Sequence, residues 1–370
     1  MDGVPAPGSR AALGAGLLGA ALGLSAWGFD AEPLWVAAGA LVALAVIAYA
    51  WVRLTAARAG VTRTLAVHRV QEGEEVPVTI DVRAGGGLPF PGGAVQDTLV
   101  RRAVDLRAGG RGVRIRARAR FDRRGLHGLP PTRVTVADPF GLSARRLQAG
   151  GDDEEVLVLP RIEPVLAPGD GQEAGRPARG RLTGTAATDI DGVGPLRDGT
   201  PASRVYWPAV ARGAEPLERR FRPDGDGRPL VVLDPRAPAT AEDLDAAVRA
   251  TASLVVHLAR AGGCWLLLPG ERRPVAVEPS LAGWDTLHAR LALVHDRQVP
   301  ALAALAGRRG AVLMVSARRR DRPPAALQGG ARTLVVPGEL AGRGPVFTVA
   351  GCHGYAIGRA ARRVVTGVTS

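Results

Sequence analysis

Ala11–Phe29 (AALGAGLLGAALGLSAWGF) and Leu34–Val52 (LWVAAGALVALAVIAYAWV) are two uncharged, apolar stretches separated only by Asp30-Ala31-Glu32-Pro33. Each has close to the roughly 20 residues that a helix needs to cross the hydrocarbon layer of a membrane. A link this short leaves room only for an antiparallel return. The sequence therefore predicts a transmembrane helical hairpin over residues 1–59, with spans at about 11–29 and 34–52.

The residues that flank the two stretches indicate how the hairpin is oriented. Aromatic side chains lie at both ends, as in the belts at the two headgroup levels: Trp27 and Trp35 beside the link, Tyr49 and Trp51 at the far end. Basic residues lie outside the spans: Arg10 before the first, and Arg53, Arg58 and Arg63 after the second. The positive-inside bias predicts a multi-pass cell-membrane protein with two spans and both termini in the cytoplasm.

Two alternatives compete with this interpretation. A cleavable signal peptide would account for the first stretch, but the apolar run exceeds the usual core of roughly 7–15 residues and a second span follows at once. A pair of buried core helices is the other alternative, but neither stretch has a polar face. We therefore expect the chain beyond residue 60 to be anchored rather than secreted.

Composition limits the chemistry of the remaining part, which is long enough for two domains. The formal net charge of +13 lies in this part, because residues 1–60 hold three arginines against Asp2, Asp30 and Glu32. Every basic side chain is arginine, which excludes a P-loop lysine and a Schiff-base lysine. Cys264 and Cys352 form no Cys-x-x-Cys spacing, so neither a disulfide framework nor a zinc site is expected.

Residues 60–166 have the pattern of a β-sandwich-like domain. Short β-type runs alternate here with Gly-rich or Pro-rich turns: Leu65–Val67, Val76–Val82, Val95–Val100, Val113–Phe121 and Val134–Val136. The clearest run is Val113–Phe121, in which apolar residues alternate with Arg114, Arg116, Arg118 and Arg120. One face of this strand is therefore expected to be buried and the other wholly cationic.

Three interpretations of this basic strand face remain open. It is a solvated face with acidic neighbours, a contact for anionic lipid or an acidic partner, or a contact for nucleic acid. The patch lacks the interleaved aromatic residues that stack on bases, and only 4% of the chain is aromatic. No specific nucleic acid is expected as a partner.

A linker over residues 167–185, rich in Gly, Pro, Ala and Arg, separates this part from residues 186–370. Strand-like runs then alternate with helical spacing, and the clearest are Leu230–Leu233, which ends at Asp234, and the helical Ala241–Ala261. Such alternation predicts a doubly wound α/β domain with a largely parallel sheet. The expected fold class is thus a membrane-anchored α+β multidomain protein.

Several separated motifs resemble the bacterial domain-of-unknown-function 58 family. Its signature has an Arg, a Gly-containing turn, an Arg shortly before a Trp, and an Ala-Arg pair, matched here by Arg197, Gly199, Arg204, Trp207 and Ala211-Arg212. The surroundings also match: two leading spans, Arg123-Arg124-Gly125, and Asp138-Pro139-Phe140-Gly141-Leu142. Many relatives carry Gly-Asp where this chain has Gly199-Thr200, so a role for that carboxylate is lost here.

The resemblance implies that the last domain is similar to a von Willebrand factor A domain. Metal-binding relatives hold a divalent ion through Asp-x-Ser-x-Ser after the first strand. This chain reads Asp234-Pro235-Arg236-Ala237-Pro238 there, which removes both serine ligands and brings in a positive charge. We expect no metal and no cofactor, and Asp234 to be a strand-end cap or an arginine partner.

No catalytic constellation is evident. Cys352 and His353 are adjacent, so their side chains diverge in extended structure, while His257, His288 and His295 are assigned to packing or surface. Gly-x-Ser-x-Gly is absent. The sequence favours a non-catalytic membrane-anchored scaffold or adaptor with cytoplasmic domains. The alternatives are a cryptic hydrolase and a basic-patch binder of lipid or nucleic acid.

The resemblance further implies that the adaptor works with a MoxR-type AAA ATPase in envelope or protein-complex assembly. In that setting the signature residues are expected to lie at a domain junction or to contact the partner: Arg197, Arg204, Trp207 and Arg212. Their arginines pair either with carboxylates of this chain or with those of the partner, and the sequence leaves both open.

Overall fold

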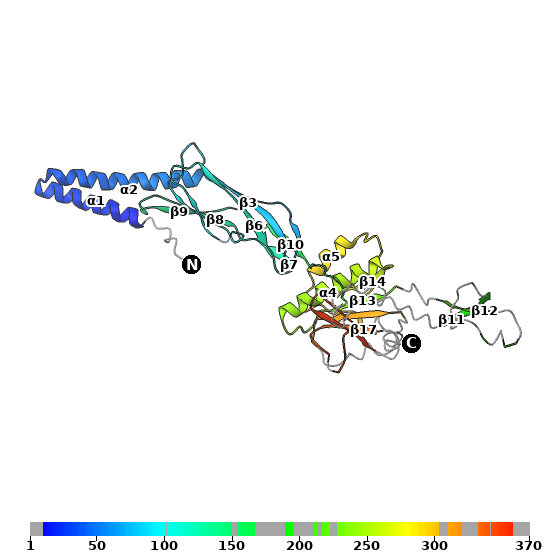
Figure 1. The fold of residues 1–370 in the computed structure, drawn as a ribbon. Coiled ribbons are helices and arrows are strands. Elements are labelled where there is room, and N and C mark those ends of the chain that lie inside the picture. Colours follow the sequence, from blue (N-terminus) through cyan, green and yellow to red (C-terminus); the bar gives the residue numbers. More distant parts are fainter. Residues whose placement is uncertain are drawn as a thin grey trace, which may run out of the picture. The chain divides into compact units, whose positions relative to one another are not determined.

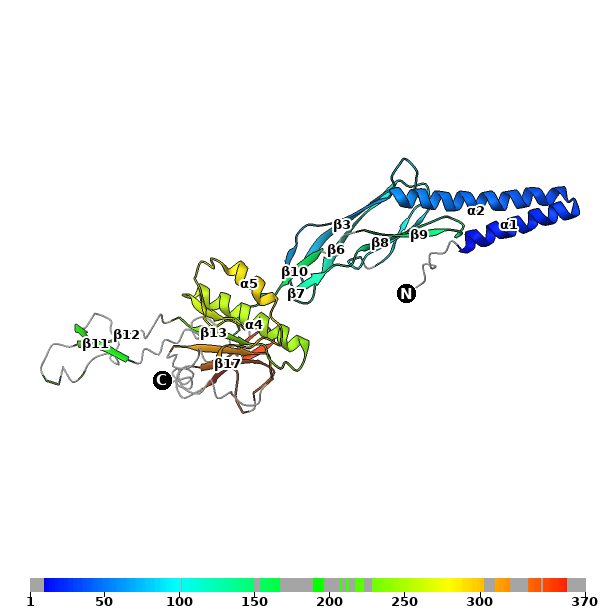
Figure 2. The ribbon, with the colours of Figure 1, turned by 180° about the vertical axis from the view of Figure 1, so that it is seen from behind.

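The computed structural model describes residues 10–100, 102–149, 154–166, 189–195, 207, 211–212, 217–222, 228–302, 310–319, 332–340 and 342–357 (Figure 1; Figure 2). The chain is an α+β protein that divides into two compact units. The first comprises Met1–Asp122 and Leu126–Val158, and the second comprises Arg123–Gly125 and Leu159–Ser370. The short segment Arg123–Gly125 thus groups with the second unit, although it lies within the sequence of the first.

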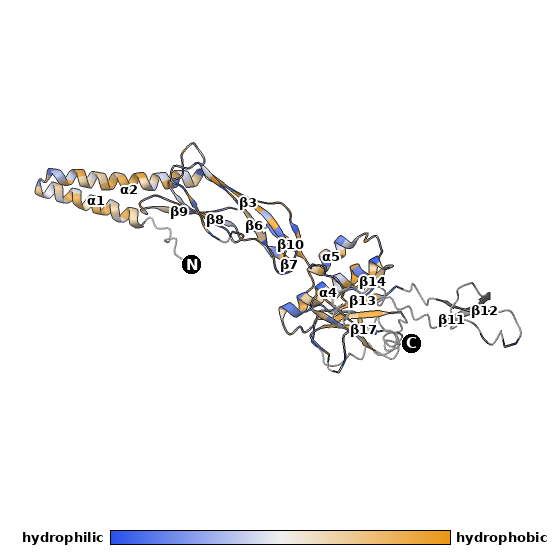
Figure 3. Ribbon diagram, in the orientation of Figure 1, coloured by the Kyte–Doolittle hydropathy of each residue, from blue (hydrophilic) through white to orange (hydrophobic). Residues whose placement is uncertain are grey.

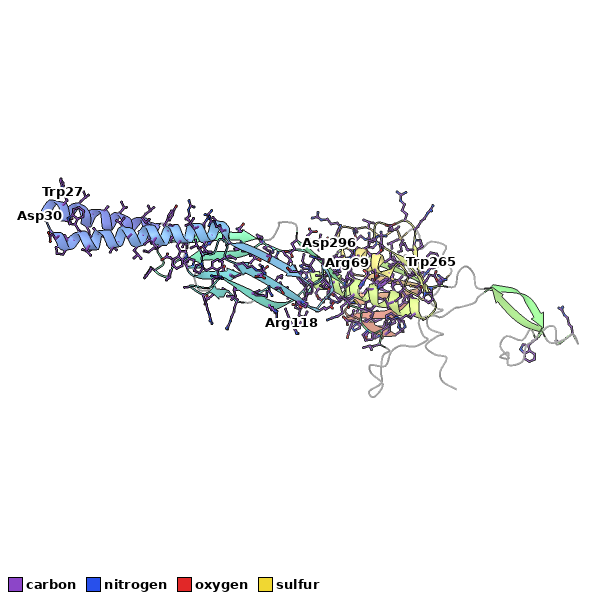
Figure 4. All side chains as sticks on the ribbon, turned by 90° about the horizontal axis from the view of Figure 1, so that it is seen from above. Trp27, Asp30, Arg69, Arg118, Trp265 and Asp296 are labelled. Carbon is purple, nitrogen blue, oxygen red and sulfur yellow. The ribbon has the colours of Figure 1, made fainter. Side chains whose placement is uncertain are left out.

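The first unit begins with two long apolar helices, α1 (Arg10–Phe29) and α2 (Glu32–Arg58), which pack against each other (Figure 3). Asp30 turns the chain between them with a positive φ of 49°, and Pro33 lies in the first turn of α2. Figure 4 places Trp27 and Asp30 at the end of the pair. By length and composition both helices could cross a membrane, as two spans or with the first as a signal sequence.

The two helices approach each other closely at Gly19. A Cβ atom built there would lie 2.8 Å from Cγ2 of Val42 and 3.0 Å from the carbonyl oxygen of Ala38. Gly23, four residues on, would place a Cβ atom within ordinary contact of Ala38 and Trp35. Small residues at this spacing let helix backbones pack in a membrane, where van der Waals contact drives association.

Gly19→Leu should therefore separate α1 from α2 and lower the thermal unfolding midpoint of the full chain in detergent, because overpacking a tight contact costs about 1–3 kcal/mol. Gly14→Leu and Gly16→Leu are matched controls in the same helix, since a Cβ atom at either position meets nothing within 4 Å. Equal midpoints for all three variants would show that α1 and α2 do not depend on this contact.

The β-part of the first unit consists of small sheets. The strands are β1 (Gly60–Leu65), β2 (Arg69–Gln71), β3 (Glu75–Arg83), β4 (Gly93–Gln96), β5 (Val104–Leu106), β6 (Gly112–Arg120), β7 (Gly125–Gly128), β8 (Thr132–Ala137), β9 (Ala144–Ala149) and β10 (Glu155–Leu159). They form three sheets, with the orders β1-β3-β6, β2-β10-β7 and β5-β4-β8-β9. The first and last of these sheets are antiparallel throughout.

Helix α2 continues beyond the expected span and enters the core of this unit. Val52 and Ala56 are buried in one cluster with Val78, Ile80 and Val134. Trp51, expected in an aromatic belt, donates its indole N–H to the carbonyl oxygen of Pro89 at 3.0 Å. The end of α2 and the strands therefore share one hydrophobic core, which leaves no free linker between them.

Arg63 is not a surface charge that flanks the second span, so the expectation that it helps to orient the hairpin is wrong. Its side chain is fully buried on β1 and lies 3.1 Å from Asp97 and 2.7 Å from Glu154. A buried, paired guanidinium does not face anionic headgroups. The basic residues that follow the second apolar stretch at the surface are therefore Arg53 and Arg58, both exposed.

The second unit contains a mixed seven-stranded sheet in the order β15-β14-β13-β16-β17-β19-β18. Its strands are β13 (Leu230–Asp234), β14 (Cys264–Leu267), β15 (Val275–Val277), β16 (Val312–Ser316), β17 (Arg332–Pro337), β18 (Phe347–Val349) and β19 (Cys352–Ile357). The four central strands are parallel, and β15 and β19 are antiparallel to their neighbours. Separately, β11 (Asp189–Pro195) and β12 (Leu217–Arg222) form a two-stranded antiparallel sheet.

The helices α4 (Ala241–Arg260) and α5 (Trp284–Ala292) flank the sheet. Residues of both helices share a core cluster with Val231 and Leu233, whereas Leu230 and Val232 belong to a cluster on the opposite face. Both faces of β13 are thus buried, as its continuous apolar run predicts. Thr240 and Asp243 form a capping box at the start of α4, which fixes where this helix begins after β13.

Candidate functional site

The strand order creates a topological switch point at the carboxyl ends of β13 and β16. From β13 the chain passes through α4 to β14 on one side, whereas β16 lies on the other side of β13. In open α/β sheets, ligands bind outside the carboxyl ends of the strands at such a point. The residues found there are Asp234 at the end of β13 and, in register with it, Ser316 at the end of β16. We call this region the carboxyl edge.

Asp234 is buried at the carboxyl edge and holds Arg236. The Arg236 Nε donates to Oδ1 of Asp234 at 2.8 Å, and Nη2 donates to Oδ2 at 3.2 Å. This side-chain hydrogen bond is the main cause of the raised pKa of Arg236. Ala237, which follows, has a positive φ of 50° between two prolines, so the loop is both rigid and strained.

A second buried carboxylate lies at the same edge. Asp243, in the first turn of α4, accepts hydrogen bonds from Nη2 of Arg319 at 3.0 Å and from Nε at 3.2 Å. The Arg319 side chain is 61% exposed, and its neighbour Arg318 is exposed as well. Both lie in the loop after β16, two and three residues beyond Ser316. The edge therefore presents guanidinium groups to solvent from two loops, with Arg236 and Arg319 each oriented by a buried acid.

This arrangement favours binding of carboxylates rather than of cations. A guanidinium has five donors, and a bidentate pair to one carboxylate leaves others for a second acceptor. The positive end of the α4 dipole adds to the attraction for anions. Within the described ranges no group of three or more His, Cys, Asp or Glu side chains could hold a metal ion.

The cysteines and the buried histidine have packing roles. Burial raises the pKa of Cys264 and of Cys352 to about 12, which disfavours the reactive thiolate of each. Cys352 and His353 are consecutive on β19 and so point to opposite faces of the sheet. His288 stacks on Trp284, its Nε2 lies 2.8 Å from the carbonyl oxygen of Pro160, and burial lowers its pKa.

Both thiols should accordingly resist alkylation. In the folded full chain at pH 8 we expect iodoacetamide to react with them roughly three orders of magnitude more slowly than with an unperturbed cysteine, whose pKa is about 8.5. Mass spectrometry of the two tryptic peptides measures the rate, and denatured protein provides the control. Rapid labelling of Cys352 alone would reveal an accessible thiolate and favour the cryptic-hydrolase alternative.

The signature residues are placed only in part. Arg197 and Arg204 lie outside the described residues. Trp207 is 57% exposed and its carbonyl oxygen accepts a hydrogen bond from the amide of Ala211 at 2.9 Å, and Arg212 is exposed. In the sequence they lie between β11 and β12, apart from the strands of the seven-stranded sheet.

The basic strand face lies on β6 and is exposed, as Figure 4 shows for Arg118. Three of its arginines have acidic partners: Arg114 with Asp81 at 2.8 Å, Arg118 with Glu75 at 3.0 Å and Arg120 with Asp122 at 2.9 Å. Hydrogen bonds from Arg83 and Arg114 lower the pKa of Asp81 to about 2. The face is thus a solvated surface with acidic neighbours, and its charge is largely compensated.

Sequence reasoning named none of Asp234, Arg236 and Arg319 as a binding residue, although it expected Asp234 to be a strand-end cap or an arginine partner. Asp234 ends an apolar run, which is a local signal, whereas the pair between Arg319 and Asp243 joins residues far apart in sequence. The signal that was available is Thr240-x-x-Asp243, a capping box that places Asp243 at the start of a helix directly after the strand end.

Comparison with known proteins yields little. No family model and no curated protein matches the chain. Among solved structures, Cwp6 from Clostridium difficile is matched with 10% identity and a TM-score of 0.16, over 69% of this chain and 33% of that one. The chain thus spans about a third of the length of this structure, and so low a TM-score carries no argument about fold or function.

Proposed function

We propose that this chain is a non-catalytic, membrane-anchored adaptor whose carboxyl edge binds an acidic segment of a protein partner. The observation that carries the proposal is the pair of buried carboxylates, Asp234 and Asp243, that hold the partly exposed Arg236 and the exposed Arg319 at the switch point. Two preoriented guanidinium groups bind carboxylates at low entropic cost, because their side chains are already held in place.

Membrane anchoring is the second part of the proposal. We propose that α1 and α2 form the two spans, with both termini in the cytoplasm. Supporting this, the close contact at Gly19 suits helix packing in lipid. The continuous core from Val52 into the strands also ties the second proposed span to the folded unit.

The resemblance to the domain-of-unknown-function 58 family supports the finer assignments. We propose that the first unit contains a β-sandwich-like domain and that the second is a von Willebrand A-like domain. In this domain the guanidinium of Arg236 takes the position near Asp234 where relatives hold a divalent ion. On the same basis, the partner is a MoxR-type AAA ATPase and the process is envelope or complex assembly.

The test is co-purification of the ATPase with the full chain from detergent-solubilised membranes. Arg318→Glu reverses an exposed charge at the carboxyl edge without touching either buried acid, and should reduce recovery of the ATPase at least tenfold. Arg260→Glu is the matched control, because this exposed arginine ends α4 and so lies at the opposite edge of the sheet.

Equal recovery with both variants, at unchanged thermal stability, would show that the carboxyl edge does not dock the partner. Absence of any ATPase from the wild-type preparation would refute the partnership itself. A signature variant, Trp207→Ala, tests the other expected contact surface in the same assay.

A further inference from the structure

The outer face of the sheet β5-β4-β8-β9 in the first unit carries a cavity of about 330 Å³. This volume lies at the lower end of the range of small-ligand pockets. Polar and basic side chains dominate its lining, which consists of Gln96, Arg133, Thr135, Arg146, Leu147 and Gln148. We call this cavity the arginine groove.

The sheet register explains why these side chains converge. Gln96 on β4 pairs with Arg133 on β8, which pairs with Gln148 on β9, so the three form one row across the sheet. Thr135 and Arg146 form the next row, two residues along. Side chains two residues apart on a strand share a face. Arg133 therefore lies between the two glutamines, and Arg146 lies beside the buried Thr135. Val134 and Val136, on the other face of β8, belong to the core.

Within the described part of the chain, the charges of the arginine groove are not compensated, unlike those of the basic strand face. Arg133 and Arg146 are both exposed, and neither side chain has an acidic partner among the described residues. The nearest acid by strand register is Asp105 on β5, which lies in the same row across the sheet as Thr135 and Arg146. Asp105 is two strands away from Thr135, so their backbones are roughly 10 Å apart at the usual strand spacing. The groove is thus the stronger local attractor for an anion.

The arginine groove lies near the end of the first unit where α1 begins and α2 ends. The turn between β8 and β9 touches α1, because the carbonyl oxygen of Leu142 accepts a hydrogen bond from the amide of Ala12 at 2.9 Å. Figures 1 and 2 both show β8 and β9 beside the end of α2. Arg146 follows Leu142 by four residues, a distance of about 13 Å along an extended strand.

The same turn exposes an aromatic side chain at the start of α1. Asp138 is buried and accepts hydrogen bonds from the amides of Phe140, at 2.9 Å, and of Ser143. These bonds fix the turn, and Phe140 at its tip is 69% exposed. An exposed aromatic residue at the level where an apolar helix begins suits the interface of a bilayer.

We propose that the arginine groove binds a phosphate group, carried by an anionic phospholipid at the membrane surface or free in solution. The guanidinium groups of Arg133 and Arg146 donate to the phosphate oxygens, and the Gln96 and Gln148 amides and the Thr135 hydroxyl supply further donors. The lipid source rests on the proposed membrane anchoring, since the headgroup layer is then within reach of Arg146. The phosphate chemistry rests on the groove alone.

Native mass spectrometry of the full chain in detergent tests this proposal, with phosphatidylglycerol and phosphatidylcholine as probes. We expect one phosphatidylglycerol to bind preferentially. The double variant Arg133→Gln/Arg146→Gln should lower the affinity for phosphatidylglycerol about twenty-five-fold, because each arginine near an anionic surface contributes a factor of about five. Arg69→Gln/Arg116→Gln is the matched control, because it removes two exposed arginines elsewhere in the first unit and should leave the affinity unchanged.

Inorganic phosphate separates the two sources. Displacement of the lipid by millimolar phosphate assigns the site to free phosphate, and retention of the lipid assigns it to the headgroup. Equal weakening by both double variants, or equal binding of the two lipids by the wild type, would overturn the proposal. The assay needs no protein partner, so its failure is distinct from that of the adaptor role.

Discussion

Replacing Arg63 with leucine should destabilise the first unit by about 3–5 kcal/mol, the usual cost of removing one member of a buried ion pair. The Arg63 Nε donates to Glu154 at 2.8 Å, and Nη1 donates to Asp97 at 3.1 Å and to the carbonyl oxygen of Pro130 at 2.7 Å. Its side chain and that of Asp97 are fully buried. The variant would leave Asp97 charged in the interior, where among the described residues it keeps hydrogen bonds from Thr132 and the amide of Leu99.

Hydrogen exchange of the β1 amides in the full chain measures this loss, because unfolding of the unit exposes them. We expect exchange to accelerate by roughly two to three and a half orders of magnitude in Arg63→Leu, at a factor of ten per 1.4 kcal/mol. Arg63→Leu/Asp97→Leu should recover part of the stability, since no charge is left unpaired. Exchange in Arg63→Leu no faster than in Arg69→Leu, an exposed arginine on β2, would contradict a structural role for the pair.

Arg124→Leu should destabilise the second unit by a similar amount, about 3–5 kcal/mol. The Arg124 Nε lies 3.0 Å from Asp245 on α4, and both side chains are almost fully buried. Its Nη1 donates to carbonyl oxygens at the end of α5, those of Ala292 and Val294 at 2.9 Å. The Arg124 guanidinium thus bonds to carbonyl oxygens that have no partner within α5, and its charge complements the negative end of the α5 dipole.

Arg123 is the matched control for this prediction. It contacts the same carboxylate of Asp245, at 3.1 Å, but its side chain is 60% exposed. Arg123→Leu should therefore cost less than about 1 kcal/mol, as exposed ion pairs usually do. The comparison is read from hydrogen exchange of the α5 amides. Similar exchange in Arg123→Leu and Arg124→Leu would show that burial does not decide the strength of these contacts.

The elements with strong local patterns were predictable from the sequence. Two uncharged stretches of spanning length became α1 and α2, and the alternation over Val113–Phe121 became β6, Gly112–Arg120. The helix expected over Ala241–Ala261 is α4, Ala241–Arg260, because its periodicity and its capping box agree. These signals lie within a few residues of each other, so no tertiary information is needed to read them.

The buried arginines were not predictable. Arginine is rarely buried unless paired, so Arg63 was assigned to the membrane surface and Arg124 only to a motif. Their partners are distant in sequence, 91 residues from Arg63 to Glu154 and 168 from Arg124 to Ala292. Only the fold brings such residues together. The arginine groove also depends on the register between β4, β8 and β9, which the sequence pattern does not specify.

Anchoring with both termini in the cytoplasm is the claim on which the adaptor role depends, and paired reporter fusions after Ser370 test it directly. We expect a fluorescent protein at this position to be bright and a periplasmic phosphatase to be inactive, with the intact chain in the membrane fraction. Phosphatase activity, or a chain released without its first helix, would contradict the account.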